Sequence, residues 1–189
     1  SLVITVGEAA AIREDMGKYP LFVRSFEAMK ARVETALNRP IEVPPPGEGG
    51  GYEHERHKQN YREMQEAGIY FTITGDKRAA GFIRDMLLKY ADLYPTLGRH
   101  PQAKDQAPGK LFHQMLNETL WLTNAAMAYD CVHDQLTPAV RAGIEKNLFR
   151  PMIAWFTNEN RKEFKRIHNH GTWTVCSIGL IGHVLCDRE

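Results

Sequence analysis

The chain of 189 residues has no long hydrophobic run and no block of charge of one sign, and it contains only three cysteines. Its longest apolar stretch, about residues 173–185, contains His183 and is shorter than the roughly 20 residues that a membrane-spanning helix needs. Lys and Arg number 24 against 23 Asp and Glu, so no basic surface for a phosphate backbone is indicated. The sequence therefore predicts neither membrane insertion nor nucleic-acid binding.

Motifs for cofactor chemistry are lacking too. The chain contains no Gly-rich phosphate loop and no GxSxG elbow, and its GEGGG string lies in a proline-rich segment without a preceding strand. Cys131, Cys176 and Cys186 show neither metal-ligand nor disulfide-framework spacing, and we expect them to be buried thiols. We expect no cofactor and no metal site, and the sequence argues against phosphoryl and hydride transfer.

What the chain does have is helical periodicity. Apolar residues recur at intervals of three and four, and no segment alternates with period two for long enough to predict a strand. Helices are expected in the N-terminal part and then over residues 54–73, 77–93, 111–132, 139–156 and 172–185. Short turns between successive helices indicate antiparallel pairs. We therefore predict an all-α fold, an incomplete (α/α) toroid built from antiparallel helical hairpins, with helix 172–185 largely buried in its inner ring. A globular helical bundle is the alternative.

Composition divides the chain into three parts. Residues 1–40 are expected to form a helical arm, and residues 41–53 a linker rich in proline and glycine. Residues 54–189 are expected to form the first part of the toroid. The last expected helix ends without a partner helix after it, so we expect the chain to be truncated. It begins without Met, and we expect any export signal to have been removed already or left off.

Asn169 and His170, in the string RIHNHGTW, are the first candidate site residues. They stand where the most apolar helix begins, and backbone dipoles favour negative charge at a helix start. Amide and imidazole donors there suit the stabilisation of a carboxylate whose neighbouring carbon loses a proton. The structural alternative is that Asn169 caps the helix and His170 packs against Trp173.

Gln114 and Asn117, in LFHQMLNETLW, are the second pair. They stand three residues apart, so on one helix they share a face and point two amides into one cleft, where they can hold hydroxyl groups. Buried amides need partners, so pairing with a neighbouring loop is the structural alternative.

The string HERHKQNY places His54 and His57 three residues apart, one short of the HExxH zinc motif. We therefore expect a solvated basic helix start rather than a zinc site, with a sugar-contacting edge as the alternative.

Four sequence strings, taken in order, indicate a protein family. They are GGGYEHERHKQNY, TGDKRAAGFIRDMLLKYADLYPTLGRHP, PGKLFHQMLNETLWL and RIHNHGTW. Together they resemble the N-terminal half of the alginate lyases of polysaccharide lyase family 17, the oligoalginate lyases, over about residues 2–187. The resemblance implies an incomplete (α/α) toroid followed by a β-sandwich of the heparinase II/III type. It also implies cleavage of alginate oligosaccharides by β-elimination, usually from the chain end.

Carried over by position, the resemblance implies that Asn169 and His170 neutralise the C5 carboxylate of the uronate, and that Gln114 and Asn117 line the cleft. It places the tyrosine that protonates the leaving O4, and the zinc of the β-sandwich, beyond residue 189. The implied partners are an alginate or other uronate oligosaccharide and the remainder of the enzyme, in the periplasm or outside the cell.

Other classes of function remain open at this point. A non-catalytic uronate-binding helical module would use the same cleft. A heparinase-like lyase acting on a glycosaminoglycan fits as well, because every uronate offers the same carboxylate. A glycoside hydrolase would need two carboxylates facing one bond, and Glu118 has no evident partner.

Overall fold

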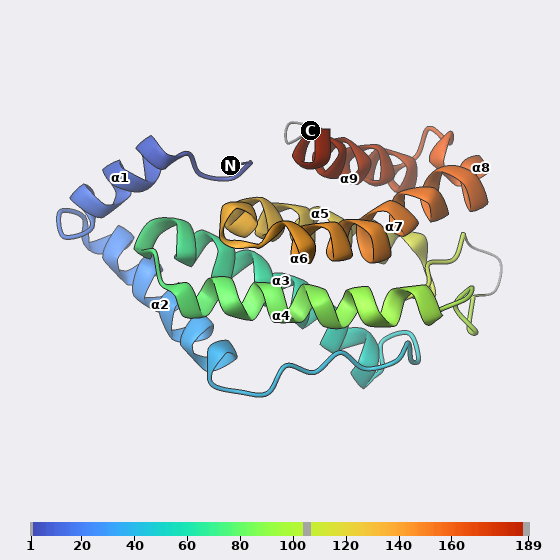
Figure 1. The fold of residues 1–189 in the computed structure, drawn as a ribbon, viewed down its shortest axis with the longest axis horizontal. Coiled ribbons are helices and arrows are strands. Elements are labelled where there is room, and N and C mark those ends of the chain that lie inside the picture. The colour runs from blue at the N-terminus through green and yellow to red at the C-terminus, as the bar shows by residue number, and fades with distance from the viewer. Residues whose placement is uncertain (1, 104–106, 187–189) are drawn as a thin grey trace.

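The computed structural model describes residues 2–103 and 107–186, and every regular element in those ranges is helical (Figure 1). The long helices are α2 (Pro20–Leu37), α3 (Tyr52–Thr74), α4 (Lys77–Leu93), α5 (Met115–Val132) and α9 (Asn169–Cys186). The short ones are α1 (Val6–Asp15), α6 (Pro138–Ile144), α7 (Arg150–Ala154) and α8 (Arg161–Phe164). Two π-helical segments lie between the short helices. Glu145–Phe149 joins α6 to α7, and Trp155–Glu159 follows α7 directly. The predicted all-α fold is confirmed, whereas the closure into a toroid stays a prediction.

Turn chemistry explains the hairpins. Helix α3 ends at Gly75, whose φ of 75° lies in the left-handed region that favours glycine. Asp76 then caps α4 by accepting a hydrogen bond from the Arg78 N–H at 2.9 Å. Thr137 caps α6 in the same way, with Pro138 at the first helical position. These signals fix where each helix of a pair stops and its partner starts.

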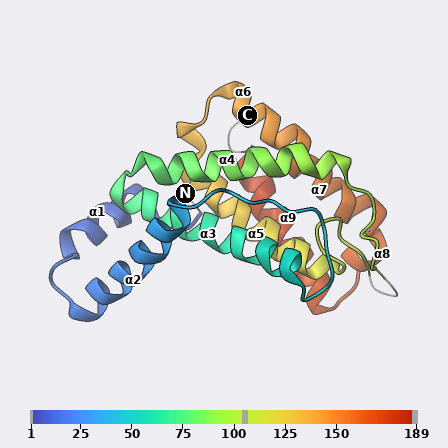
Figure 2. The same cartoon turned by 90° about the horizontal axis from the view of Figure 1, so that it is seen from below.

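The core lies where α3 packs on both α4 and α5, and where α5 packs on α9 (Figure 2). Trp121 of α5 and Tyr90 of α4 are fully buried, with ring centroids 4.6 Å apart. Gly68 allows α3 and α5 to approach closely, since a Cβ there would lie 3.3 Å from the Ala128 Cα. Large aromatic side chains and one small residue therefore set the spacing of the central helices.

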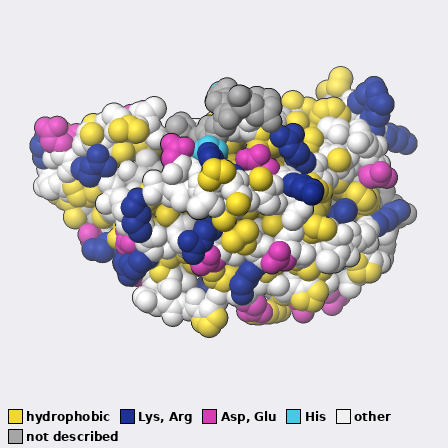
Figure 3. All heavy atoms as spheres, in the orientation of Figure 1, with side chains coloured by type: hydrophobic (Ala, Val, Ile, Leu, Met, Phe, Trp, Pro, Cys, Tyr) yellow, Lys and Arg dark blue, Asp and Glu magenta, His cyan; other side chains and the backbone are white. Residues whose placement is uncertain are grey.

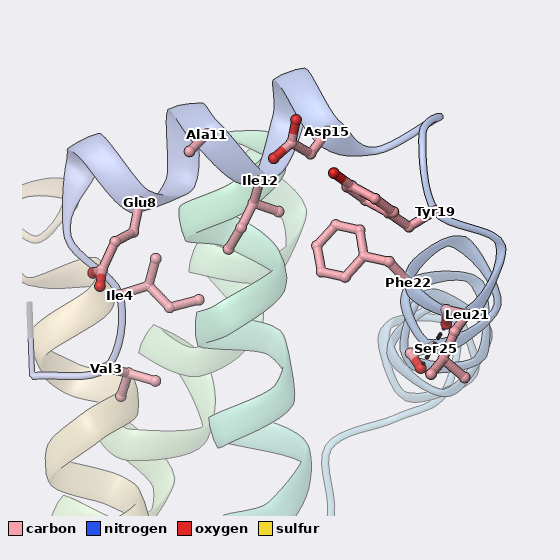
Figure 4. A pocket seen from close by; sticks show the side chains of 10 residues that line it. All are labelled: Val3, Ile4, Glu8, Ala11, Ile12, Asp15, Tyr19, Leu21, Phe22 and Ser25. Atoms are coloured by element: carbon pink, nitrogen blue, oxygen red, sulfur yellow. Dashed lines mark hydrogen bonds between the residues drawn. The ribbon is translucent and has the colours of Figure 1, made fainter.

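The N-terminal arm lies against this body. Arg13 of α1 donates to the carbonyl of Ile73 at 2.8 Å, and Arg32 of α2 forms an ion pair with Glu66 of α3 at 2.8 Å. Between α1 and α2 an open apolar hollow of about 870 Å³ is lined by side chains that include Ile12 and Phe22 (Figure 4).

The expected linker follows α2 without helical structure before α3 begins at Tyr52. The Lys89 ammonium donates to the carbonyl of Ile41 at 2.8 Å, and the Asn60 amide donates to that of Glu42 at 2.8 Å. The linker is thereby held against α3 and α4.

The surface carries no large patch of one sign on the face that Figure 3 shows, where Lys and Arg alternate with Asp and Glu. Among the described helices, none combines the length and the apolar character that crossing a bilayer requires.

Helix α9 departs from the prediction. One face is buried against α5, with Thr174, Ser177 and Ile181 inside. On the other face Trp173 is 40% exposed and Val175 55%. The prediction of a largely buried helix 172–185 is therefore wrong. An all-round apolar sequence shows that a helix can be buried on every side, but α9 packs mainly on α5 and α8 within the described chain.

The expectation of three buried thiols also needs correction. Cys176 lies on the exposed face of α9 and Cys131 is only partly buried. The side chain of Cys186 falls outside the part of the chain that is described.

Candidate functional site

The first turn of α9 presents Asn169 and His170. His168 occupies the cap position: its carbonyl accepts from the Thr172 N–H at 2.9 Å, and its Nδ1 accepts from the His170 N–H at 3.4 Å. The alternative that Asn169 caps the helix is therefore wrong. Asn169 is exposed and His170 is partly buried in the first turn, where the helix dipole favours an anion.

Gly171 determines what lies against this turn. A Cβ at Gly171 would come within 2.1 Å of the Arg166 carbonyl oxygen and 3.3 Å of the Glu163 carbonyl oxygen. Only glycine allows the backbone after α8 to pass this closely over α9. The close passage brings the Glu163 Oε1 to 3.4 Å from the His170 Nδ1, with side-chain exposures of 14% and 15%.

Gln114 reaches the same histidine from the other motif. Its Nε2 lies 3.5 Å from the His170 Nε2, although the two residues are 56 positions apart. A carboxamide carries both an N–H donor and an accepting oxygen, so Gln114 can pair with either a donating or an accepting ring nitrogen. The structure thus brings Gln114 and His170 into contact, as a site shared by the two motifs would require. Their functional roles stay a prediction.

The local geometry of Gln114 differs from the prediction. Helix α5 begins at Met115, and Gln114 precedes it in an extended conformation, with φ −126° and ψ 126°. The expected common helical face of Gln114 and Asn117 is therefore wrong. Asn117 is partly buried in the first turn of α5, and its N–H donates to the Gln114 carbonyl at 3.1 Å. In the sequence, Asn117 lies three residues after Gln114, and Asn169 lies directly before His170.

Glu118 explains why α5 starts late. Its fully buried carboxylate accepts from the Lys110 N–H at 2.6 Å, the Leu111 N–H at 2.9 Å and the Tyr94 hydroxyl at 2.7 Å. These bonds hold the backbone before Gln114 in a loop rather than a helix. Gly109 is needed beside them, because a Cβ there would lie 2.0 Å from the Glu118 Oε2. Burial raises the pKa of Glu118, although these hydrogen bonds oppose the rise.

The same loop is held from the other side. The Trp155 indole N–H and the Asn160 amide both donate to the Pro108 carbonyl, at 2.8 and 3.1 Å. The Lys110 ammonium lies 5.0 Å from the Tyr94 ring centroid and 5.1 Å from that of Trp155. The loop that ends at Gln114 is therefore held by Trp155 and Asn160 on one side and by Glu118 on the other. The Glu118 carboxylate binds this loop and does not face a substrate bond.

The two histidines and Arg56 at the start of α3 are buried, so the expectation of a solvated basic helix start is wrong. His54 is 7% exposed and His57 is fully buried. The His57 Nδ1 lies 2.8 Å from the Tyr90 hydroxyl, which also accepts from the Asn60 amide at 2.9 Å. Burial lowers the pKa of His57 to about 4, so its ring is neutral at pH 7. Phe112, whose ring centroid lies 5.1 Å from that of His54, supplies part of the burial.

Glu163 and His168 are the residues near the site that sequence reasoning missed. Together with His170 they place one ligand atom each within 4.8 Å of one another, a donor set of the type that zinc uses. The Arg166 Nη1 lies 3.6 Å from the Glu163 Oε2 and opposes a divalent cation there. The one sequence cue to Glu163 is Gly171, which indicates a close backbone approach without naming the residue that it admits.

Comparison with known proteins places these residues in a family. The model of the alginate lyase family matches residues 28–189, so the chain belongs to that family. Over its whole length the chain is 38% identical to an exo-oligoalginate lyase of Saccharophagus degradans and 40% identical to an alginate lyase of Stenotrophomonas maltophilia. It spans about a quarter of the length of these curated relatives, 26% and 25%. The family expected from the four sequence strings is confirmed.

Proposed function

We propose that this chain supplies the carboxylate-neutralising part of the active site of a lyase that cleaves alginate oligosaccharides by β-elimination. The observation that carries the proposal is the contact between Gln114 and His170. It joins two polar motifs from distant segments beside the first turn of α9, in a member of the alginate lyase family. We further propose a periplasmic or extracellular enzyme, because such a location gives access to a polysaccharide substrate.

The chemistry explains why these residue types are needed. In β-elimination a base removes the C5 proton, the C4–O4 bond breaks, and the electron pair of the C5–H bond forms the C4–C5 double bond. Negative charge builds on the C5 carboxylate while the proton leaves. Donors that meet the carboxylate at that moment lower the barrier, and loss of one such donor typically costs about 3 kcal/mol.

Each residue has a distinct part in the proposal. The Asn169 amide and the His170 Nε2 donate to the carboxylate oxygens, and the N-terminal dipole of α9 adds to their effect. Gln114, and Asn117 one turn further on, hold the sugar by amide hydrogen bonds. The base that takes the C5 proton and the acid that protonates O4 come from residues outside this chain.

The test uses an enzyme of the full length of the relatives. His170→Ala and Asn169→Ala are each expected to lower kcat on alginate oligosaccharides about 100-fold, with a smaller change in KM, because the lost interaction strengthens in the transition state. Absorbance of the new C4–C5 double bond measures the rate.

Matched controls are His183→Ala on the same helix and Asn158→Ala on an exposed turn, which should keep wild-type turnover. Near-wild-type turnover in His170→Ala or Asn169→Ala would remove that residue from catalysis. Equal activity on heparin oligosaccharides would contradict alginate as the substrate class.

A further inference from the structure

We propose that Glu163 is a positioning residue for His170, which holds the imidazole by Nδ1 so that Nε2 faces Gln114 and the substrate. The inference rests on the proposed function of His170 and names the residue that sets the ring for it. Nothing in the family match assigns a role to Glu163.

The two ring nitrogens of His170 face different neighbours. The His170 Nδ1 lies 3.4 Å from the Glu163 Oε1, and the His170 Nε2 lies 3.5 Å from the Gln114 Nε2. A doubly protonated imidazole donates from both nitrogens. With the Glu163 carboxylate beside Nδ1, the ring is oriented so that Nε2 faces Gln114 and the substrate side, and Nε2 donates to a substrate carboxylate when the ring carries both protons.

Glu163 is itself held in place. Its side chain is 14% exposed, and its second oxygen lies 3.6 Å from the Arg166 Nη1. Because Gly171 has no side chain, the backbone of Glu163 and Arg166 can lie directly against the first turn of α9. A carboxylate fixed by a neighbouring cation and by backbone packing can orient a ring, whereas a mobile surface carboxylate cannot.

The contact is longer than a well-formed hydrogen bond. The 3.4 Å between the Glu163 Oε1 and the His170 Nδ1 is an ion-pair distance, and the attraction applies when the ring carries both protons. The charged groups facing His170 are Glu163 and Arg166 from α8 and the segment after it, with the His168 ring at 4.9 Å between centroids. Gln114 faces it as a neutral group.

A metal ion held by Glu163, His168 and His170 explains the cluster less well. The His168 Nδ1 already accepts the helix-capping bond from the His170 N–H, and the ring is exposed. The Arg166 guanidinium beside Glu163 repels a cation. Orientation of His170 accounts for all of these contacts at once.

The first test reads the His170 ring directly by nitrogen NMR in the chain of residues 1–189. In Glu163→Gln the His170 Nδ1 resonance should shift and its Nδ1 proton should exchange with solvent at least twofold faster, while the His183 ring signals stay unchanged. Glu163→Asp, which keeps the carboxylate, should restore most of the slow exchange, and Glu159→Gln, an exposed acid before α8, should have no effect. An unchanged His170 signal in a folded Glu163→Gln chain would overturn the proposal.

The second test measures kinetics in the full-length enzyme. Glu163→Gln should lower kcat about 10-fold or more with little change in KM, and should move the basic limb of the kcat–pH profile to lower pH. A uniform loss at every pH would indicate a purely structural role and contradict positioning. One zinc ion bound per chain, and lost in both Glu163→Gln and His168→Ala, would replace positioning by a metal site. If His170→Ala keeps its turnover while the NMR result holds, the proposed function fails and the orientation of the ring by Glu163 stands.

Discussion

At the scale of single residues, the candidate site requires two glycines at positions where a side chain would not fit. Gly171 and Gly109 each occupy a place where a methyl group would overlap a backbone oxygen or a buried carboxylate. Gly171 admits the segment that carries Glu163, and Gly109 admits the Glu118 carboxylate under the loop before Gln114. Neither requirement follows from the conformational freedom of glycine, since neither residue has a positive φ.

Gly171→Ala is therefore expected to destabilise the chain by about 1–3 kcal/mol, because the new methyl group overpacks against the Arg166 carbonyl. Gly179→Ala is the matched control on the same helix, since nothing lies within 4 Å of its Cβ position. There the substitution should stabilise by about 0.5–1 kcal/mol through helix propensity. Urea denaturation of both variants checks the prediction, and a shift of the same sign in both would refute the overlap at Gly171.

At the scale of elements, local turn signals could be predicted from the sequence and tertiary contacts could not. The α3–α4 turn and the start of α6 follow from Gly75, Asp76, Thr137 and Pro138, which act on their own neighbours. The start of α5 differs from the prediction because the Glu118 carboxylate binds the N–H groups of Lys110 and Leu111 and holds this segment as a loop.

The burial of side chains depends on tertiary contacts in the same way. Apolar periodicity does not show that the rings at the start of α3 pack beneath Phe112, nor that α9 is covered on one face. Of the candidate site, the meeting of the two polar motifs could be anticipated. Glu163 could not, because a four-residue helix carries it seven positions before His170.

The loop before Gln114 should behave as one unit with Glu118. Glu118→Gln replaces one accepting oxygen by an NH2 group that faces backbone N–H donors, so about 1–3 kcal/mol of stability should be lost. In the full-length enzyme KM should rise as Gln114 loses its fixed position. Glu159→Gln, an exposed residue, is the control for loss of a negative charge. Unchanged stability in Glu118→Gln would contradict the anchoring role.

At the scale of the whole molecule, the chain is a helical body with a polar site at one end of α9 and a buried histidine at the start of α3. The family assignment applies to the whole molecule, while the proposed chemistry concerns a few side chains near the first turn of α9. Its stability should depend on pH through the buried histidine, which has no part in the proposed chemistry.

His57 sets the sign of that dependence. Its pKa is lowered from 6.5 to about 4 in the folded chain, so the unfolded chain binds more protons between these values and stability falls as the pH drops through this window. Between pH 7.5 and 5 the loss from His57 should be about 2 kcal/mol. Burial also lowers the pKa values of His54 and His100, which adds loss of the same sign. Denaturation at both pH values should show a smaller loss in His57→Asn than in the wild type, and an equal loss would count against the neutral buried ring.

The central claim is that Gln114 and His170 serve one uronate site, and a double-mutant cycle in the full-length enzyme tests it most directly. The cycle compares kcat/KM on an alginate oligosaccharide for the wild type, Gln114→Ala, His170→Ala and the double variant. Residues in contact within one site should couple by about 0.5–3 kcal/mol, so the double variant should lose less than the sum of the single losses. Two large single losses that simply add would separate the residues into independent roles, and two single variants with wild-type rates would contradict the shared site altogether.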